Sequence, residues 1–365
     1  MGAPPRLEFK NAMTLPNGAS SSPAYPLGAL APGEPREIEP GFWVLPVPVP
    51  FPPGAVNCLA IAEPDGPFEG GWTLVDTGFQ DDRSKALWSD WLSGPLAGRP
   101  VARLIGTHHH PDHIGLAGWF QSERGAALWM TRTAWLYARM LQLDAWTDPP
   151  AEAERFFIEA GYGEAMLARW RKRAALNFSV TVAPMPLGVR TVAEGEVLRL
   201  GGADWRVLYG HGHAPDHLVL VRATDGLTIA GDAVLPRITP NIGLYATEPD
   251  GDPLGDWMDA CARLAIHLGD DQLILPGHGD PFTGARTRLR DIVAKHERGL
   301  DRLHAHLSEP RTVVDCFPAL YRREITPALE GLATNETRSH LNRLLHAGRA
   351  TRAKRPDGAW LWRAV

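Results

Sequence analysis

The sequence predicts an α/β protein in which two sheets are stacked between layers of helices. Short apolar runs typical of strands occur in two groups, one on each side of a long stretch with helical character. The chain thus has two successive halves of strands followed by helices, which suits paired sheets covered on their outer faces. Hydrophobic residues make up 44% of the 365 residues and charged residues 22%, enough apolar material for a packed core.

The first half begins with a segment of low sequence complexity. Residues 1–40 are rich in Pro, Gly, Ala and Ser, and we expect an irregular lead-in there. A strand is predicted for 42–49, where Pro46 and Pro48, together with Pro50 just after it, restrict it to a sheet edge or force it out of the sheet. Further strands are expected at 56–62, 72–75, 101–106 and 127–130, with helices at 82–92 and at 111–122, the latter emerging from a loop.

The second half begins after a helical insertion. Residues 132–176 are predicted to be helical, with a break at Asp148-Pro149-Pro150. The insertion is rich in aromatic residues, which we expect mainly to pack in the core, with the roof of an apolar substrate pocket as the alternative. Strands are expected at 180–183, 197–200, 205–209, 218–222, 227–230 and 273–275. A long helix at 286–307 precedes a helix at 335–346 and two β runs around the 356–358 turn, which predicts a winged-helix-like module.

Charge and cysteine content narrow the classes of protein. The chain has 37 Lys and Arg against 42 Asp and Glu, a net charge of −5, which excludes a uniformly basic surface for nucleic acid. Cys58, Cys261 and Cys316 lie far apart and form no CxxC motif, which indicates a reducing compartment. No run approaches the ~18 apolar residues of a membrane helix, and the first residues lack a secretory pattern. We therefore expect a cytoplasmic protein without membrane contact.

The most specific signal is the segment Thr107-His108-His109-His110-Pro111-Asp112-His113. In an extended loop, residues two apart point to the same side, so His108 and His110 are placed to bind one metal ion while His109 faces away. Asp112 and His113 follow where the chain turns into a helix, and they project towards a neighbouring position. Imidazole and carboxylate ligands suit Zn²⁺, and also iron or manganese.

Three further predicted strands each end in a glycine next to a residue that can bind a metal ion. His213, Asp232 and His278 each follow a short apolar strand and lie next to glycine. Glycine allows a sharp turn there and leaves room around a metal ion. Each of these signals is weak alone, but together with the histidine motif they complete a ligand set for two metal ions.

These motifs, taken in order, resemble the metallo-β-lactamase superfamily. The matching segments are Asp76 in VDTG, the motif at 108–113, GHAPDH at 212–217, GD at 231–232 and PGHG at 276–279. The resemblance covers about 41–285 and implies an αββα sandwich, with a helical insertion at about 132–176 and the C-terminal module at 286–365. It implies two divalent ions, with Zn²⁺ favoured. His108, His110 and His213 would bind the first ion, Asp112, His113 and His278 the second, and Asp232 both, while Asp76 and His217 would orient these ligands.

The ligand set is similar to that of the glyoxalase II and lactonase type. It implies a hydrolase that uses a metal-bridging hydroxide on an ester, thioester or lactone, with Asp112 as both ligand and proton acceptor. No cysteine lies near Asp232, which argues against a β-lactamase, and the sequence after His278 lacks the basic cluster for glutathione. The loop 231–242 resembles that of bacterial hydrolases with a C-terminal winged helix. Arg237 and Asn241 are candidate substrate contacts there, with an ordinary loop ion pair as an equal alternative for Arg237.

Two other functions remain as alternatives to a small-molecule acyl hydrolase. An RNA or DNA endonuclease would grip its substrate through six basic residues, at positions 338, 343, 349, 352, 354 and 355. A solvated surface is the preferred interpretation of these residues. A non-catalytic binding protein is the second alternative, but a complete ligand set argues against it. By analogy with the family, a homodimer is one expected assembly.

Overall fold

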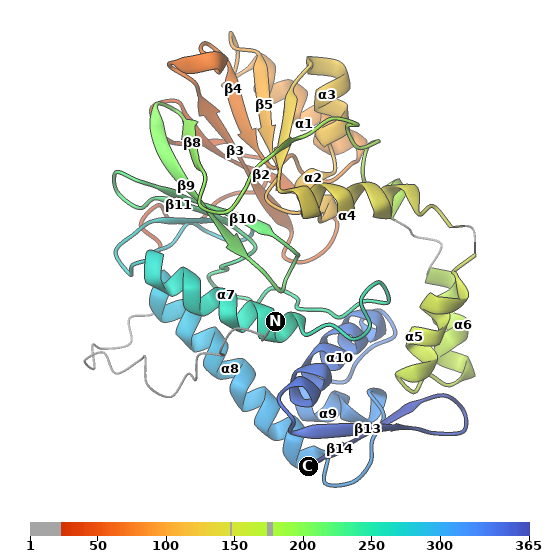
Figure 1. The fold of residues 1–365 in the computed structure, drawn as a ribbon. Coiled ribbons are helices and arrows are strands. Elements are labelled where there is room, and N and C mark those ends of the chain that lie inside the picture. The colour runs from red at the N-terminus through yellow and green to blue at the C-terminus, as the bar shows by residue number, and fades with distance from the viewer. Residues whose placement is uncertain (1–22, 147, 174–177) are drawn as a thin grey trace, which may run out of the picture.

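The computed structural model describes residues 23–146, 148–173 and 178–365, and it shows two sheets packed face to face between helices (Figure 1). The first sheet has seven strands in the order β1-β2-β3-β4-β5-β6-β7, and the second has five in the order β12-β11-β10-β9-β8. The strands of the first sheet are β1 (Arg36–Glu39), β2 (Phe42–Pro48), β3 (Ala55–Ala62), β4 (Trp72–Val75), β5 (Val101–Ile105), β6 (Ala127–Met130) and β7 (Arg190–Thr191). Those of the second are β8 (Val197–Leu200), β9 (Ala203–Gly210), β10 (His217–Arg222), β11 (Thr228–Gly231) and β12 (Ile274–Pro276).

Buried side chains alternate between the two faces of each sheet, which produces one core between the sheets and one core under each layer of helices. In β5, Leu104 packs towards the helices on the outer face and Ile105 packs between the sheets. In β10, Val219 faces the outer helices while Leu218 and Leu220 join the core between the sheets. Because side chains in a strand point alternately to opposite faces, each sheet buries both of its faces.

Helices cover the outer face of each sheet. The seven-stranded sheet is covered by α1 (Asp82–Ser93), α3 (Ala117–Arg124) and α4 (Arg132–Leu143), and the five-stranded sheet by α7 (Pro253–His267) and α8 (Ala285–His306). The Asp81 carboxylate accepts a hydrogen bond from the backbone N–H of Ser84 and so caps α1 at the predicted position. Helix α1 then buries Trp88 and Trp91 against the sheet.

The insertion lies against the C-terminal module. The insertion contributes α5 (Ala151–Glu159) and α6 (Glu164–Arg173), and the module contains α9 (Phe317–Leu320), α10 (Glu330–His346), β13 (Ala350–Lys354) and β14 (Trp360–Ala364). The buried Arg338 of α10 donates to the Phe156 carbonyl oxygen and to Glu159 of α5. Figure 1 shows α5 and α6 beside α10 and the terminal hairpin.

Most predicted elements occur where the sequence places them, but one predicted strand is absent and several observed elements were not predicted. The expected irregular lead-in contains β1, and a strand predicted at 180–183 is instead the end of a 3₁₀ helix, Phe178–Val180, followed by a loop. Strand β7 and helix α7 were not expected. The helix and hairpin of the C-terminal module are present, while their assignment as a winged helix and the domain boundaries stay predictions.

The prolines do not restrict β2 to the edge of the sheet or force it out, since β2 lies between β1 and β3. Strand β2 pairs with β3 along its whole length, but β1 pairs with it only at 42–44. Pro46 and Pro48 therefore lie where β2 has β3 as its one ladder partner, so their missing N–H groups break no ladder. Among the described residues, no helix combines the length and the apolar character needed to cross a bilayer.

Candidate metal centre

The candidate ligands gather at one edge of the sandwich because strands from both sheets end there. The histidine motif follows β5, His213 follows β9, Asp232 follows β11 and His278 follows β12. Strands β4 and β5 are parallel, as are β11 and β12, so their carboxyl ends meet at the same edge. All seven predicted ligands are brought together in this way.

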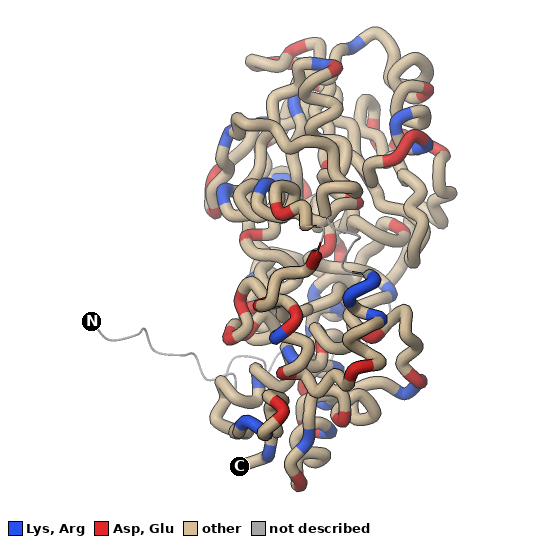
Figure 2. The backbone as a smooth tube through the Cα atoms, turned by 90° about the vertical axis from the view of Figure 1, so that its right-hand side faces the viewer, with Lys and Arg blue, Asp and Glu red and all other residues tan. Residues whose placement is uncertain are grey.

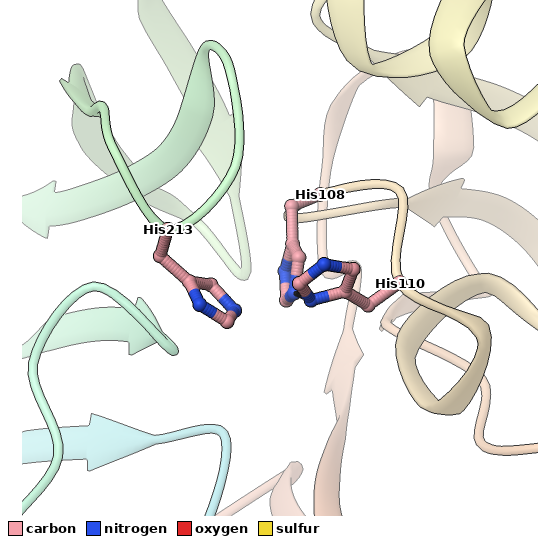
Figure 3. A group of neighbouring side chains, drawn as sticks. All are labelled: His108, His110 and His213. Atoms are coloured by element: carbon pink, nitrogen blue, oxygen red, sulfur yellow. Dashed lines mark hydrogen bonds between the residues drawn. The ribbon is translucent and has the colours of Figure 1, made fainter. Parts of the chain in front are cut away.

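Three histidines form the first group of possible ligands. His108 and His110 approach from the loop after β5, and His213 approaches from the other sheet (Figure 3). One nitrogen from each ring lies within 4.8 Å of the others. Nε2 of His108 is 3.0 Å from Nδ1 of His110, a spacing that one shared metal ion would explain.

A second group consists of Asp112, His113 and His278, whose ligand atoms also lie within 4.8 Å of one another. His278 Nε2 is 3.2 Å from Oδ2 of Asp112. Asp232 lies between the groups: its Oδ2 is 3.5 Å from His213 Nε2 and 3.4 Å from His278 Nε2, while its Oδ1 is 3.5 Å from His113 Nε2. This is the position that a bridging carboxylate requires.

The orientation of three ligand rings is fixed through Nδ1. Nδ1 of His113 lies 2.7 Å from Oδ2 of Asp76. Nδ1 of His213 lies 2.6 Å from the carbonyl oxygen of Asn241, and Nδ1 of His278 lies 2.6 Å from the carbonyl oxygen of Ala55. An imidazole that donates from Nδ1 leaves the lone pair of Nε2 available for a metal ion. The surrounding oxygens therefore select the tautomer that binds metal through Nε2.

Asp76 ties the histidine motif to the end of β4. Its carboxylate accepts hydrogen bonds from the backbone N–H and the hydroxyl of Thr107, each at 2.8 Å, as well as from His113. The side chain is buried, and its backbone has a φ of 58°, in the left-handed region. Asp76 thus positions both the loop and one ligand ring.

His217 contacts two of the candidate ligands and holds them in position. Its Nε2 accepts a hydrogen bond from the backbone N–H of Asp232 at 3.0 Å, and its ring stacks on His108 with centroids 4.5 Å apart. Gly231 has a φ of 48°, and a Cβ there would lie 2.6 Å from the His217 ring. The glycine is therefore required for this close approach, and His217 acts as a positioning residue.

The donor set fits divalent cations. His113 Nε2, His213 Nε2 and Oδ1 of Asp232 are buried and have no hydrogen-bond partner. Leaving such atoms unpaired costs about 1–3 kcal/mol each. A divalent cation among the two groups would satisfy them, and nitrogen and carboxylate ligands match Zn²⁺.

Electrostatics in the site support the same interpretation. Burial, together with the neighbouring histidines, lowers the pKa of His108 and of His110, so both rings are neutral and able to bind metal. Burial alone would raise the pKa of Asp232, but the adjacent His278 and His113 hold it well below its usual value. Burial would likewise lower the pKa of His278, yet Asp232 and Asp112 raise it to about 10. In the metal-free chain, Nε2 of His278 therefore carries a proton between the carboxylates of Asp112 and Asp232, and a divalent cation bound at that position would replace this proton.

Several supporting residues were not expected from the sequence. The Asn57 amide, in β3, donates to the carbonyl oxygens of Pro276 at 2.9 Å and Gly279 at 2.7 Å, so it clamps the loop that carries His278. Thr107 and the carbonyl groups of Ala55 and Asn241 were also missed. A buried asparagine in an otherwise apolar strand was the available signal for Asn57.

The two candidate substrate residues have different positions. The Arg237 side chain is 68% exposed and contacts Asp280 at 3.4 Å and the Tyr25 hydroxyl at 3.2 Å, which is the loop ion pair weighed for it. Asn241 meets the site through its carbonyl oxygen on His213, and Oδ1 of its side chain is buried without a partner. A substrate contact remains a prediction for both.

The four-layer sandwich and its edge site define a class of protein, and sequence comparison gives the same class. The sequence model of the Metallo-beta-lactamase superfamily matches residues 51–291, so the chain belongs to this superfamily. The model of the Metallo-beta-lactamase-like C-terminal domain matches residues 300–365.

Individual proteins are similar to this chain over different shares of its length. The crystal structure of a Beta-lactamase domain protein from Burkholderia ambifaria is 30% identical, with a TM-score of 0.86, and the match covers 94% of this chain and 98% of that one. The Probable metallo-hydrolase YqjP of Bacillus subtilis is 26% identical over 74% of this chain and 83% of its own length. The Hydroxyacylglutathione hydrolase GloC of Haemophilus influenzae is 23% identical over 49% of this chain and 69% of its own length.

Proposed function

We propose that this metallohydrolase binds two divalent ions, with Zn²⁺ as the expected metal, and cleaves an ester, thioester or lactone bond of a small molecule. The observation that carries the proposal is the position of Asp232 between two groups of ligands. A carboxylate that faces both groups is what a two-metal centre needs. The relative GloC is, by its name, a hydroxyacylglutathione hydrolase, which supports hydrolysis of an acyl compound.

The bound metals would supply a water of lowered pKa as the nucleophile and would polarise the bond that is cleaved. The chain itself positions the groups around that reaction. Oδ2 of Asp112 lies 3.2 Å from His278 Nε2, at the second group, and is placed to accept a proton from the nucleophile. The hydrogen bonds from His113, His213 and His278 to fixed oxygens hold the ligand rings in place while this occurs.

Charge pairing disfavours the endonuclease alternative. Each of the six basic residues proposed to contact nucleic acid forms an ion pair within the chain: Arg338 and Lys354 with Glu159, Arg343 with Asp252, Arg349 with Asp301, Arg352 with Asp250 and Arg355 with Asp357. Figure 2 shows blue and red positions interspersed over this part of the chain. Since these cations already have carboxylate partners, the patch offers few free charges to a phosphate backbone.

The test measures the hydrolysis of several classes of substrate by the Zn²⁺-loaded full chain. The panel contains an aryl ester, a thioester, a lactone, a cephalosporin, bis-(4-nitrophenyl) phosphate and single-stranded RNA. We expect cleavage of at least one acyl substrate and loss of that activity, by about a hundredfold or more, in Asp112→Asn and in His110→Ala. Cleavage of RNA or of the phosphodiester without any acyl turnover would refute the proposal.

A control separates loss of chemistry from loss of metal. Both variants should be assayed for bound zinc, because Asp112→Asn changes a predicted ligand as well as a proton acceptor. Asp90→Asn, on the exposed side of α1, is the matched control for a lost carboxylate and should retain full activity. Loss of activity in Asp90→Asn would show that the assay reports general damage.

A further inference from the structure

A cavity of about 400 Å³ lies directly beside the metal centre, within the size range of small-molecule pockets. Its walls come from three helices of the insertion and from a loop after β11. They include Tyr137 and Leu141 of α4, Ala153 and Phe157 of α5, Trp170 of α6, and Tyr245. The walls are therefore mainly aromatic and aliphatic.

The cavity and the first ligand group share a residue. His110 belongs to the group with His108 and His213, and it also lines the cavity beside His109 and Pro111. A molecule that fills the cavity is therefore adjacent to the reacting centre. His109, which the sequence predicted to face away from the metals, packs against Tyr137, with ring centroids 5.0 Å apart.

The charges around the cavity restrict what it can hold. No Lys or Arg is among the described residues that line it, and the one acidic residue among them is Asp144. A carboxylate or phosphate on the part of the ligand that lies away from the metal centre would therefore find no Lys or Arg as a counter-ion, and its burial there would cost free energy. An apolar, uncharged group gains free energy from burial there instead.

Two polar atoms at the cavity lack partners. Nδ1 of His109, which is 7% exposed, and Oδ1 of Asn335 in α10 are both buried without a hydrogen bond, and both residues line the cavity. A single polar group on an otherwise apolar ligand could satisfy one of them. Asn335 also makes the C-terminal module part of the pocket wall.

We propose that this cavity binds an uncharged acyl or aryl group of the substrate, so that the preferred substrates are esters or thioesters of medium-chain or aromatic acids. This inference rests on the proposed acyl hydrolase function and specifies which acyl groups the enzyme prefers. It excludes substrates in which the group next to the scissile bond carries a carboxylate or a phosphate. The ligands lie at the end of the cavity that His109 and His110 form.

The first part of the test compares substrates. We expect kcat/KM to rise about fourfold for each methylene added from 4-nitrophenyl acetate to 4-nitrophenyl hexanoate, because each methylene is buried. The matched charged substrate is the 4-nitrophenyl monoester of glutaric acid, which equals the pentanoate in chain length. We expect it to be cleaved at least roughly tenfold less well than the pentanoate.

The second part measures binding without catalysis. N-phenyl-1-naphthylamine, an uncharged fluorescent aromatic amine, should bind the metal-free full chain. Ala153→Phe fills the cavity and should weaken that binding roughly tenfold and flatten the dependence on chain length. Ala151→Phe, on the exposed side of the same helix, is the matched control and should change neither.

Leu141→Phe provides a second filling variant in case Ala153→Phe does not fold, as judged by thermal melting. Unchanged dye affinity and unchanged chain-length preference in a folded filling variant would overturn the proposal. Equal cleavage of the pentanoate and the glutarate monoester would also overturn it while leaving the acyl hydrolase function intact. Dye binding that the filling variants weaken, without cleavage of any ester, would support the cavity assignment and refute only the proposed reaction.

Discussion

Asp76 stands at the end of β4 in a backbone conformation that few residues adopt readily. Its φ of 58° is tolerated by Asp and Asn better than by other residues with a side chain. Its carboxylate meanwhile accepts hydrogen bonds from Thr107 and His113. The residue thus combines a turn with the orientation of a ligand, and these two roles can be separated by substitution.

Asp76→Asn keeps the turn but removes the charge and one acceptor. We expect Zn²⁺ affinity to fall about 10- to 100-fold, since loss of a group that orients a metal ligand typically has this effect. Competition with a fluorescent zinc chelator measures the change. Asp90→Asn is the control, and equal zinc affinity in both variants would show that Asp76 does not orient the site.

The candidate ligands could be predicted because their side chains are of the types that bind metal ions, and because few sequences have these residues at this spacing. The supporting groups could not be predicted in the same way. The carbonyl oxygens of Ala55 and Asn241 orient His278 and His213, but a backbone oxygen is present at every residue. Their role depends on which strands and loops meet, which only the folded chain reveals.

At the scale of elements, most strands and helices with strong local patterns were predicted, but helix α7 was missed although Asp252 caps it and its sequence is amphipathic. Two strands were missed because their patterns are weak. Strand β1 has the sequence REIE and β7 only two residues, so neither carries an apolar run. The residues 180–183 have such a run, but the N–H of Ala183 donates to the Gly115 carbonyl oxygen in a loop, outside any ladder. Long-range contacts decide these cases, and local propensity does not.

Helices α8 and α10 meet through a buried pair of histidines. Nδ1 of His296 lies 3.1 Å from Nε2 of His340, and the His296 ring packs against Trp257 of α7. Burial, with smaller contributions from His340 and Lys295, lowers the pKa of His296 from 6.5 to about 3. The folded protein therefore keeps this ring neutral in mild acid.

This pKa shift predicts acid sensitivity of known sign. Below the unfolded pKa the unfolded chain binds a proton at His296 that the folded chain does not, so the free energy of unfolding falls as the pH falls towards 3. Between about pH 7.5 and about pH 5.5, His296 should account for a loss of about 1.4 kcal/mol. Urea unfolding of wild type and His296→Phe at both pH values measures this difference, and identical pH dependence would contradict the buried neutral ring.

At the scale of the whole molecule, the metal centre joins the two sheets. Asp112 and His113 follow a strand of the first sheet, while His213, Asp232 and His278 follow strands of the second. Metal bound among these ligands would therefore link the two halves of the sandwich.

Removal of the metals should accordingly destabilise the fold. A ligand present at about a thousand times its dissociation constant stabilises the folded state by about 4 kcal/mol, and a chelator would abolish that contribution. Differential scanning calorimetry with and without chelator should show a lower melting temperature without metal. The chelator effect should be smaller in His213→Ala, and an unchanged melting temperature in wild type would argue against bound metal.

The paired basic residues of the C-terminal module predict weak contact with nucleic acid. At about 150 mM salt we expect single-stranded RNA to bind with a dissociation constant of about 10⁻⁴ M or weaker, at the weak end of the range for non-specific contacts. Replacement of Arg349, Arg352 and Arg355 together by serine should leave that affinity unchanged in fluorescence anisotropy. Micromolar binding that the triple variant abolishes would restore the endonuclease alternative.

Apart from the 109–111 segment, which holds the ligand His110 and also lines the cavity, the pocket walls and the metal ligands come from different parts of the chain. The ligands follow strands of the two sheets, whereas the walls come largely from α4 to α6, the 245–247 loop and α10. Mutations that reshape the pocket can therefore accumulate during evolution without moving a ligand. Related chains with the same reaction centre are free to diverge in the compounds they accept, and the insertion is the segment whose variation would record that divergence.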